Sequence, residues 1–214
     1  MENKYKEILK KKKFTLFCKR CFDILFSFFG ILLLLPLFII VYLLVACTSK
    51  GGGIYKQVRV GKNNMDFKIY KFRTMVKDAD RKGLQISTSE DARITKAGKM
   101  LRKTKIDELP QLFNVLIGNM SFVGPRPEVR EYVDLYNEEQ KNVLLVKPGI
   151  TEIASIKFRD ENEILSKTDN PRDKYITDIM PIKINYGLEY IENFTIGMDV
   201  KIILCTVLKI KGKK

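Results

Sequence analysis

Residues 22–47 read FDILFSFFGILLLLPLFIIVYLLVAC, and this apolar segment decides how the chain is organised. Its length, about 26 residues, is enough for a helix that crosses a bilayer, which needs about 20. The segment is too long for a cleavable signal peptide and has no small-residue cleavage site. It therefore indicates a protein that associates with a membrane.

Three features of the segment disfavour a simple spanning helix. Pro36 lies near its middle, where proline removes a backbone hydrogen bond and bends a helix. Asp23 lies inside it, where a charge needs a partner or the membrane interface. Both flanks are basic, although an asymmetry of flanking charge is what orients a spanning helix. A helix that turns at Pro36 and leaves by the face it entered fits these features about as well as a bitopic helix with a proline kink. The basic residues are Lys10, Lys11, Lys12, Lys13, Lys19 and Arg20 before the segment, and Lys50, Lys56, Arg59 and Lys62 after it.

Both ends of the chain are rich in lysine. Residues 1–13 interleave lysines with Tyr5, Ile8 and Leu9, a composition that suits an anionic membrane surface. Residues 198–214 place apolar side chains at helical spacing, which predicts an amphipathic helix. This helix either lies in the interface or packs on the core, and the lysines at its end favour the interface. The apolar positions are Val200, Ile203, Leu204, Val207 and Leu208, and the lysines are Lys209, Lys211, Lys213 and Lys214.

Composition narrows the chemistry that the chain can perform. Its 214 residues are 45% hydrophobic, which is enough for one domain with a core. A formal charge of +14 attracts anions but does not choose among nucleic acid, anionic lipid and phosphorylated substrates. The absence of histidine excludes histidine bases and histidine-ligated metals. Cys18 and Cys21 have redox or zinc spacing, but no second pair completes a zinc site, so we interpret them as reduced apolar residues.

The rest of the chain alternates short helices and strands. Gly51 to Gly53 break the chain, and residues 54–60 and 67–72 alternate apolar and polar side chains around a turn at 61–64, which predicts a β-hairpin. Helices are predicted over 94–104, from near Asp107 to 117, over 129–145 and over 186–193. A helix plus loop is predicted over 77–90, a strand over 150–158 and a loop over 160–173. The pattern indicates an α+β fold with a membrane part at 1–50 and a second domain at 51–214.

The adjacent carboxylates Asp107 and Glu108, hereafter the dyad, are the first candidates for chemistry. On its own, an acidic pair at a helix start is most often a cap and a first-turn acid. Here Arg102, Lys103 and Lys105 precede it. An acidic pair within a basic surface can hold Mg²⁺ and can meet a phosphate that the cations neutralise. A carboxylate can also attack phosphorus to give an acyl phosphate.

Two other stretches carry cations that suit phosphate. In VGPRP at 123–127, Arg126 stands between two prolines that stiffen the backbone, and a stiff guanidinium suits bidentate phosphate binding. In KIYKFRTM at 68–75, alternation places Lys71 and Arg73 on one strand face, where they either touch phosphate or form a solvated surface. No glycine-rich phosphate loop occurs, so cations and metal must hold any phosphate.

Several runs in a fixed order give the chain a resemblance to a known family. It resembles the bacterial sugar transferases, monotopic phosphoglycosyl transferases that begin glycan assembly on a polyprenol phosphate, over about residues 18–210. The runs are KRxxD at 19–23, QxRxG at 57–61, YKFRTM at 70–75, LRKT at 101–104, DELPQLFNV at 107–115, VGPRP at 123–127 and KPGIT at 147–151.

The resemblance implies a reaction and a set of roles. Asp107 would attack the β-phosphate of a UDP-sugar with loss of UMP, and the phospho-sugar would pass to undecaprenyl phosphate. Asp107 and Glu108 would hold Mg²⁺. Phosphates would be neutralised by Arg73, Arg102, Arg126 and Arg159.

The resemblance also implies a location and an architecture. The apolar segment would be a re-entrant helix–break–helix at Pro36, on the cytoplasmic face of the inner membrane. It would precede a compact, mostly helical catalytic domain with a small hairpin or sheet and interfacial amphipathic helices. The oligomeric state stays open, with a homodimer as one candidate.

The chain departs from the family at two places. Leu35 precedes Pro36 where the family usually has serine, so a serine hydrogen bond at the bend is missing. After KPGIT the family usually continues with Gly-Trp and later Asn-Gly-Arg, whereas this chain has EIASIKFR at 152–159 and keeps only Arg159. Because this region shapes the sugar or nucleotide pocket, the sugar is not predicted.

Two other classes of function remain as alternatives. A non-catalytic, membrane-anchored basic protein would bind anionic lipid or nucleic acid and would need no acidic pair between rigid arginines. A bitopic scaffold would place its two termini on opposite faces of the membrane. The enzyme is the hypothesis that explains the dyad, and it needs no nucleic acid.

Overall fold

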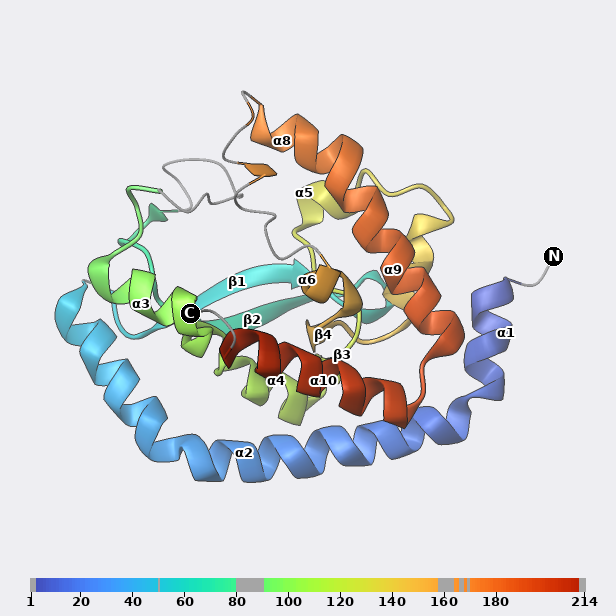
Figure 1. Cartoon of the computed structure of the whole chain (residues 1–214), viewed down its shortest axis with the longest axis horizontal. Coiled ribbons are helices and arrows are strands. Elements are labelled where there is room, and N and C mark those ends of the chain that lie inside the picture. Colours follow the sequence, from blue (N-terminus) through green and yellow to red (C-terminus); the bar gives the residue numbers. More distant parts are fainter. Residues whose placement is uncertain are drawn as a thin grey trace.

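A computed structural model describes residues 3–49, 51–79, 91–157, 164–165, 168 and 170–211. Two small sheets lie among helices, and the long helix α2 (Lys13–Thr48) runs along one side of the molecule (Figure 1). Helices α4 (Gln111–Ile117) and α10 (Ile196–Lys211) lie between α2 and the sheets in this view. The α+β prediction is confirmed.

Helix α2 is continuous through Pro36 and curves along its length (Figure 1). The expected non-helical break at Pro36 is therefore absent. The 36 residues of α2 make a helix of about 54 Å, which by length and composition could cross a membrane. Its apolar side chains are mostly exposed, as the 80% exposure of Leu33 illustrates.

One stripe of α2 belongs to the folded domain at both ends of the helix. Near its start, Asp23 is buried and its Oδ1 accepts hydrogen bonds from the Ser121 hydroxyl (3.0 Å) and the Phe122 amide (3.1 Å). The partner that the sequence demanded for this acid is thus a strand of the domain. Near its end, α2 contributes to a cluster with side chains from the hairpin and two helices, formed by Phe38, Val41, Val45, Phe72, Leu101 and Leu112.

The N-terminal helix α1 (Lys4–Lys11) packs one side against the domain rather than lying free. Its Tyr5 is buried in the main core, and Asn3 Nδ2 donates to Asn142 Oδ1 at 2.6 Å. Lys12 then donates to the carbonyls of Glu192 (2.8 Å) and Phe194 (3.1 Å). The lysine-rich start therefore presents only its outer side to its surroundings.

The predicted hairpin is confirmed, and a second sheet joins segments far apart in sequence. Strands β1 (Ile54–Val60) and β2 (Asp66–Phe72) pair antiparallel, with Ile54 opposite Phe72. The turn η1 (Lys62–Asn64) carries Asn63 at a φ of 57°, a left-handed conformation that asparagine tolerates. Strands β3 (Ser121–Val123) and β4 (Gly149–Thr151) pair parallel.

Three predicted elements differ from the structure. The predicted helix 129–145 is two pieces, α5 (Arg130–Val133) and η4 (Gln140–Leu145), because Asn137 and Gln140 cap each other's amides and start a new turn. The predicted strand 150–158 stops at Thr151, and α6 (Ile153–Lys157) follows. The predicted helix 186–193 begins earlier: α8 (Pro171–Lys174), the π-helix η5 (Tyr175–Ile179) and α9 (Met180–Asn193) run in succession. The predicted helix plus loop at 77–90 falls largely outside the described residues. The predicted loop at 160–173 is only partly described, and its end is helical because α8 begins at Pro171.

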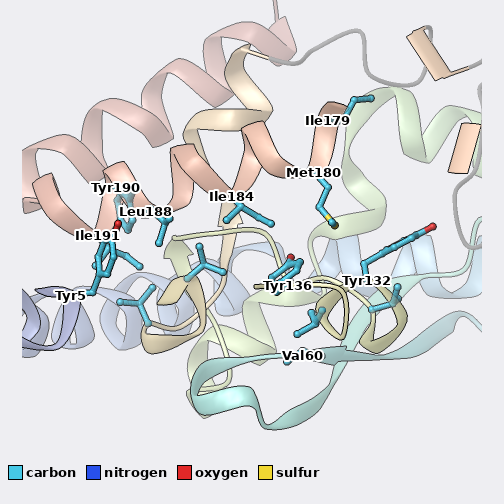
Figure 2. Packing of buried hydrophobic residues seen from close by; sticks show 14 of the residues in the cluster. Tyr5, Val60, Tyr132, Tyr136, Ile179, Met180, Ile184, Leu188, Tyr190 and Ile191 are labelled. Carbon is cyan, nitrogen blue, oxygen red and sulfur yellow. The ribbon is translucent and has the colours of Figure 1, made fainter. Parts of the chain in front are cut away.

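The main core gathers aromatic and aliphatic side chains from α1, α9 and the segments around β3 (Figure 2). Tyr190 and Ile191 of α9 lie near Tyr5 of α1 in this view, whereas Tyr132 and Tyr136 lie toward the hairpin. Helix α10 buries Ile202 in this core and exposes Leu204, Val207 and Leu208. One face of α10 thus packs on the core, and the other remains available to an interface.

Candidate active site

The dyad lies in a short turn of its own between two helices. Helix α3 (Lys96–Thr104) ends at Lys105, whose φ of 59° reverses the chain. The 3₁₀ turn η3 (Ile106–Glu108) carries the dyad, and Pro110 then leads into α4. The prediction that one helix starts near Asp107 is therefore wrong in detail. Left-handed Lys105 separates the acids from the basic helix and turns them back toward the hairpin.

Helix α3 is held against the end of β2 by close backbone contact. A Cβ on Gly98 would lie 2.0 Å from the Thr74 carbonyl oxygen, so only glycine fits. Arg102 Nε donates to Thr74 Oγ1 at 2.9 Å. The turn that follows α3 is thereby positioned relative to the strand.

Asn114 fastens α4 to the free edge of β2. Its Oδ1 accepts from the Tyr70 amide at 2.9 Å, and its Nδ2 donates to the Lys68 carbonyl at 2.8 Å. The side chain is completely buried. One amide group thus substitutes for a neighbouring strand, and it sets where residue 71 lies relative to η3.

Glu108 forms ion pairs with two cations. Lys71 Nζ lies 3.0 Å and Arg126 Nη2 3.3 Å from the same oxygen, Oε1. Burial alone would raise the pKa of Glu108, but Lys71 and Arg126 together hold that pKa well below its usual range. Glu108 is therefore a permanent anion that fixes two cations at one point.

Asp107 has the opposite environment. It is 8% exposed, and its Oδ1 is a buried oxygen with no hydrogen-bond partner among the described residues. Burial and the neighbouring Glu108 raise the pKa of Asp107, although Lys71, Lys105 and Arg102 oppose the rise. Aspartate carboxylates can form covalent intermediates, and this oxygen has no hydrogen bond to lose before such an attack.

Arg126 comes from a loop that is fastened on both sides. Its amide donates to Glu152 Oε2 at 2.9 Å. The carbonyl of the following residue, Pro127, accepts from Arg59 Nη1 at 3.2 Å. Arg59 also lies 3.6 Å from Glu128 Oε2. Gln57 acts on the same loop indirectly, because its Oε1 accepts from Arg59 and holds that guanidinium in place.

A comparison with family models identifies the family of the chain. The model described as "Bacterial sugar transferase" matches residues 14–213. The chain belongs to the bacterial sugar transferase family. The resemblance stated from the motifs is thereby confirmed.

Individual relatives of this bacterial sugar transferase are named for their functions. A UDP-N-acetylgalactosamine-undecaprenyl-phosphate N-acetylgalactosaminephosphotransferase from Aeromonas hydrophila is 39% identical over 89% of this chain and 43% of its own length. A UDP-glucose:undecaprenyl-phosphate glucose-1-phosphate transferase from Klebsiella pneumoniae is 41% identical over 89% and 39%. An exopolysaccharide production protein of Rhizobium leguminosarum bv. phaseoli is 39% identical over 89% and 93%. The chain spans about two fifths of the first two relatives, so it corresponds to a segment of them.

The structure brings most of the predicted site residues together. Arg126 contacts the dyad, and the charge of Arg102 acts on Asp107. Arg73 lies at the base of the hairpin, where its Nη2 donates to the Ile54 carbonyl at 3.4 Å. Arg159 falls outside the described residues.

Of the residues around the dyad, Lys71 has a weak signal in the sequence and Glu152 has none. Lys71 was noticed only as one of two cations on a strand face, and its pairing with Glu108 depends on how α4 docks on β2. Glu152 carried no signal at all, because its partner is a backbone amide 26 residues away. A group of three or more acidic or cysteine side chains that could hold a metal does not occur within the described ranges.

Proposed function

We propose that this chain transfers a phospho-sugar from a UDP-sugar to undecaprenyl phosphate and releases UMP. The observation that carries the proposal is the pairing of an unbonded, buried oxygen of Asp107 with a neighbour, Glu108, that is fully neutralised by cations. The functions for which the Aeromonas and Klebsiella relatives are named support the same reaction class.

In the first step, a carboxylate oxygen of Asp107 attacks the β-phosphorus of the UDP-sugar. The bond from that phosphorus to the bridging oxygen breaks, and UMP leaves with the electron pair. Lys71 and Arg126 meet at one point beside the nucleophile, so they can neutralise the phosphate oxygens as charge moves to the leaving group. An acyl phosphate remains, in which the Asp107 carboxyl carries the phospho-sugar.

In the second step, a phosphate oxygen of undecaprenyl phosphate attacks the same phosphorus. The bond to Asp107 breaks, the carboxylate is regenerated and undecaprenyl diphosphosugar leaves. The chemistry needs no general acid or base, because both leaving groups depart as anions of low basicity. This agrees with a chain that has no histidine.

The dyad suits Mg²⁺ only together with the substrate. Mg²⁺ is commonly bound by one or two carboxylates, with waters and substrate phosphates completing six oxygens. Asp107 Oδ1 is unpaired and Glu108 lies next to it, so these two residues would hold the ion. When bound, the ion would screen the repulsion between the carboxylates and the diphosphate.

We also propose that α2 re-enters the membrane and does not span it, at the cytoplasmic face of the inner membrane. The start of α2 is bound to the domain through Asp23, and its end through Val45 in the cluster with Phe72. A spanning helix would have to break the contacts at either its start or its end. The curvature of α2 supports a helix whose convex side enters the lipid (Figure 1).

The topology has a direct test. In a variant whose four cysteines are changed to serine, Lys6→Cys and Lys56→Cys place labels on exposed positions before and after α2. Re-entry predicts that an impermeant thiol reagent reaches both from the same side of sealed vesicles. Accessibility from opposite sides would reject re-entry.

The reaction is tested with a panel of UDP-sugars, undecaprenyl phosphate and Mg²⁺, with UMP release as the measurement. UDP-glucose and UDP-N-acetylgalactosamine are in the panel because relatives are named for them. We expect release with at least one sugar, and its loss in Asp107→Asn. Asp134→Asn, an exposed acid outside the site, is the matched control. Full turnover by Asp107→Asn would remove the nucleophile assignment.

A further inference from the structure

The pairing of β3 with β4 ends before it reaches Arg126, so no carbonyl of β4 accepts from the Arg126 amide. The Gly124 amide donates to the Thr151 carbonyl at 3.1 Å, which extends the pairing of β3 with β4. Pro125 has no amide hydrogen. The next donor along the chain is the amide of Arg126, and beyond Thr151 the strand β4 has ended.

A side chain supplies the missing acceptor. Glu152 Oε2 accepts from the Arg126 amide at 2.9 Å, and its Oε1 accepts from the Ser155 hydroxyl at 3.3 Å. Glu152 is only 7% exposed. A buried side-chain oxygen that accepts from a backbone amide holds the backbone of residue 126 in place, because its loss would leave that amide without a partner.

Arg126 is therefore held by two acids at its two ends. Glu152 holds the amide, and Glu108 holds the guanidinium, with Nη2 3.3 Å from Oε1. Prolines on either side leave the arginine little backbone freedom. The bond to Glu152 opposes a shift of the loop relative to the sheet.

We propose that Glu152 is a positioning residue that sets Arg126 for the diphosphate of the nucleotide-sugar. The segment after β4 and the dyad are thus connected through Glu152 and Arg126. This inference rests on the proposed function for its substrate, but the contact itself is a property of the free protein.

The kinetic test compares two substitutions of Glu152 in the full chain. Glu152→Ala removes the acceptor, and we expect the KM for the UDP-sugar to rise about tenfold, with kcat changed by less than about threefold. Glu152→Gln keeps an acceptor oxygen in the same place and is expected to restore KM to within about threefold. Glu138→Ala, an exposed acid on the surface, is the control. An unchanged KM in Glu152→Ala, or no rescue by folded Glu152→Gln, would overturn the proposal.

A second measurement separates this inference from the proposed reaction. Hydrogen exchange of the Arg126 amide, followed in the substrate-free protein, should be faster in Glu152→Ala than in wild type and Glu152→Gln. Equal exchange in all three would also overturn the proposal. If wild type releases no UMP from any sugar, the reaction fails, whereas the exchange result still reports on the contact.

Discussion

Lys71 Nζ lies 3.0 Å from Oε1 of Glu108, although 37 residues separate the two in the chain. Both side chains are largely buried, with 19% and 13% of their surfaces exposed. Burial lowers the pKa of Lys71, and Glu108 opposes that effect. A pair of this kind is costly to break, because removal of one partner leaves a buried charge unpaired.

Replacement of the cation in this pair should weaken both folding and catalysis. In Lys71→Met, Glu108 keeps only Arg126, and we expect the free energy of unfolding to fall by about 3 kcal/mol. UMP release should fall by at least about tenfold, because one phosphate-neutralising charge is gone. Lys68→Met is the matched control, since Lys68 lies on the same strand and its side chain is exposed. Similar losses in both variants would contradict a specific role for Lys71.

Asn114 should matter for stability out of proportion to its size. Asn114→Ala leaves the Tyr70 amide and the Lys68 carbonyl without their partner, at about 1–3 kcal/mol for each unsatisfied group. Denaturant unfolding in detergent measures the change. Asn119→Ala, in the loop after α4, is the comparison variant and should change stability by less than about 0.5 kcal/mol. Equal stability of the two variants would show that Asn114 does not stabilise the contact between α4 and β2.

Lys71 and Asn114 show why the site was only partly predictable from the sequence. The hairpin and α3 follow from local alternation and helical spacing, and the structure confirms them. The dyad and Arg126 were selected because their neighbours in sequence are unusual. The pairings Lys71 with Glu108 and Arg126 with Glu152 depend on docking between distant segments, which no local pattern records.

The wrong predictions have the same physical origin. Residues 129–145 have helical composition, but the reciprocal caps of Asn137 and Gln140 start a new turn there. Residues 150–158 look like a strand, yet β4 ends at Thr151 because Glu152 turns its side chain to the Arg126 amide. In each case a specific hydrogen bond overrides a weak local preference.

The fall of UMP release at low pH, the acid limb of the pH profile, should follow the protonation of Asp107. Attack needs the ionised carboxylate, and the pKa of Asp107 is raised above its ordinary value by burial and Glu108. Activity should therefore begin to fall, as pH decreases, at a higher pH than an ordinary aspartate would allow. Arg102 lowers the pKa of Asp107, so Arg102→Gln should move the limb to higher pH.

The control for this shift is Lys103→Gln, an exposed neighbour on the same helix. Its profile of UMP release against pH should superimpose on that of wild type. A shift of the same size in both variants would mean that net surface charge, rather than the position of Arg102, sets the limb.

Asp107→Asn should be more stable than wild type while it is inactive. A pKa that is higher in the folded than in the unfolded chain means that the folded state binds more protons, so stability falls as pH rises through the interval between the two values. At pH 7 the ionised side chain is thus a cost, and the neutral amide removes it. We expect a gain of about 1 kcal/mol, which corresponds to a rise in the melting temperature of roughly 2–4 °C for a chain of this size. The gain should shrink as the melts are repeated at lower pH, and it should vanish once Asp107 is protonated in both the folded and the unfolded chain. A less stable Asp107→Asn at pH 7 would show that the buried carboxylate is held by favourable contacts and is not a strained nucleophile.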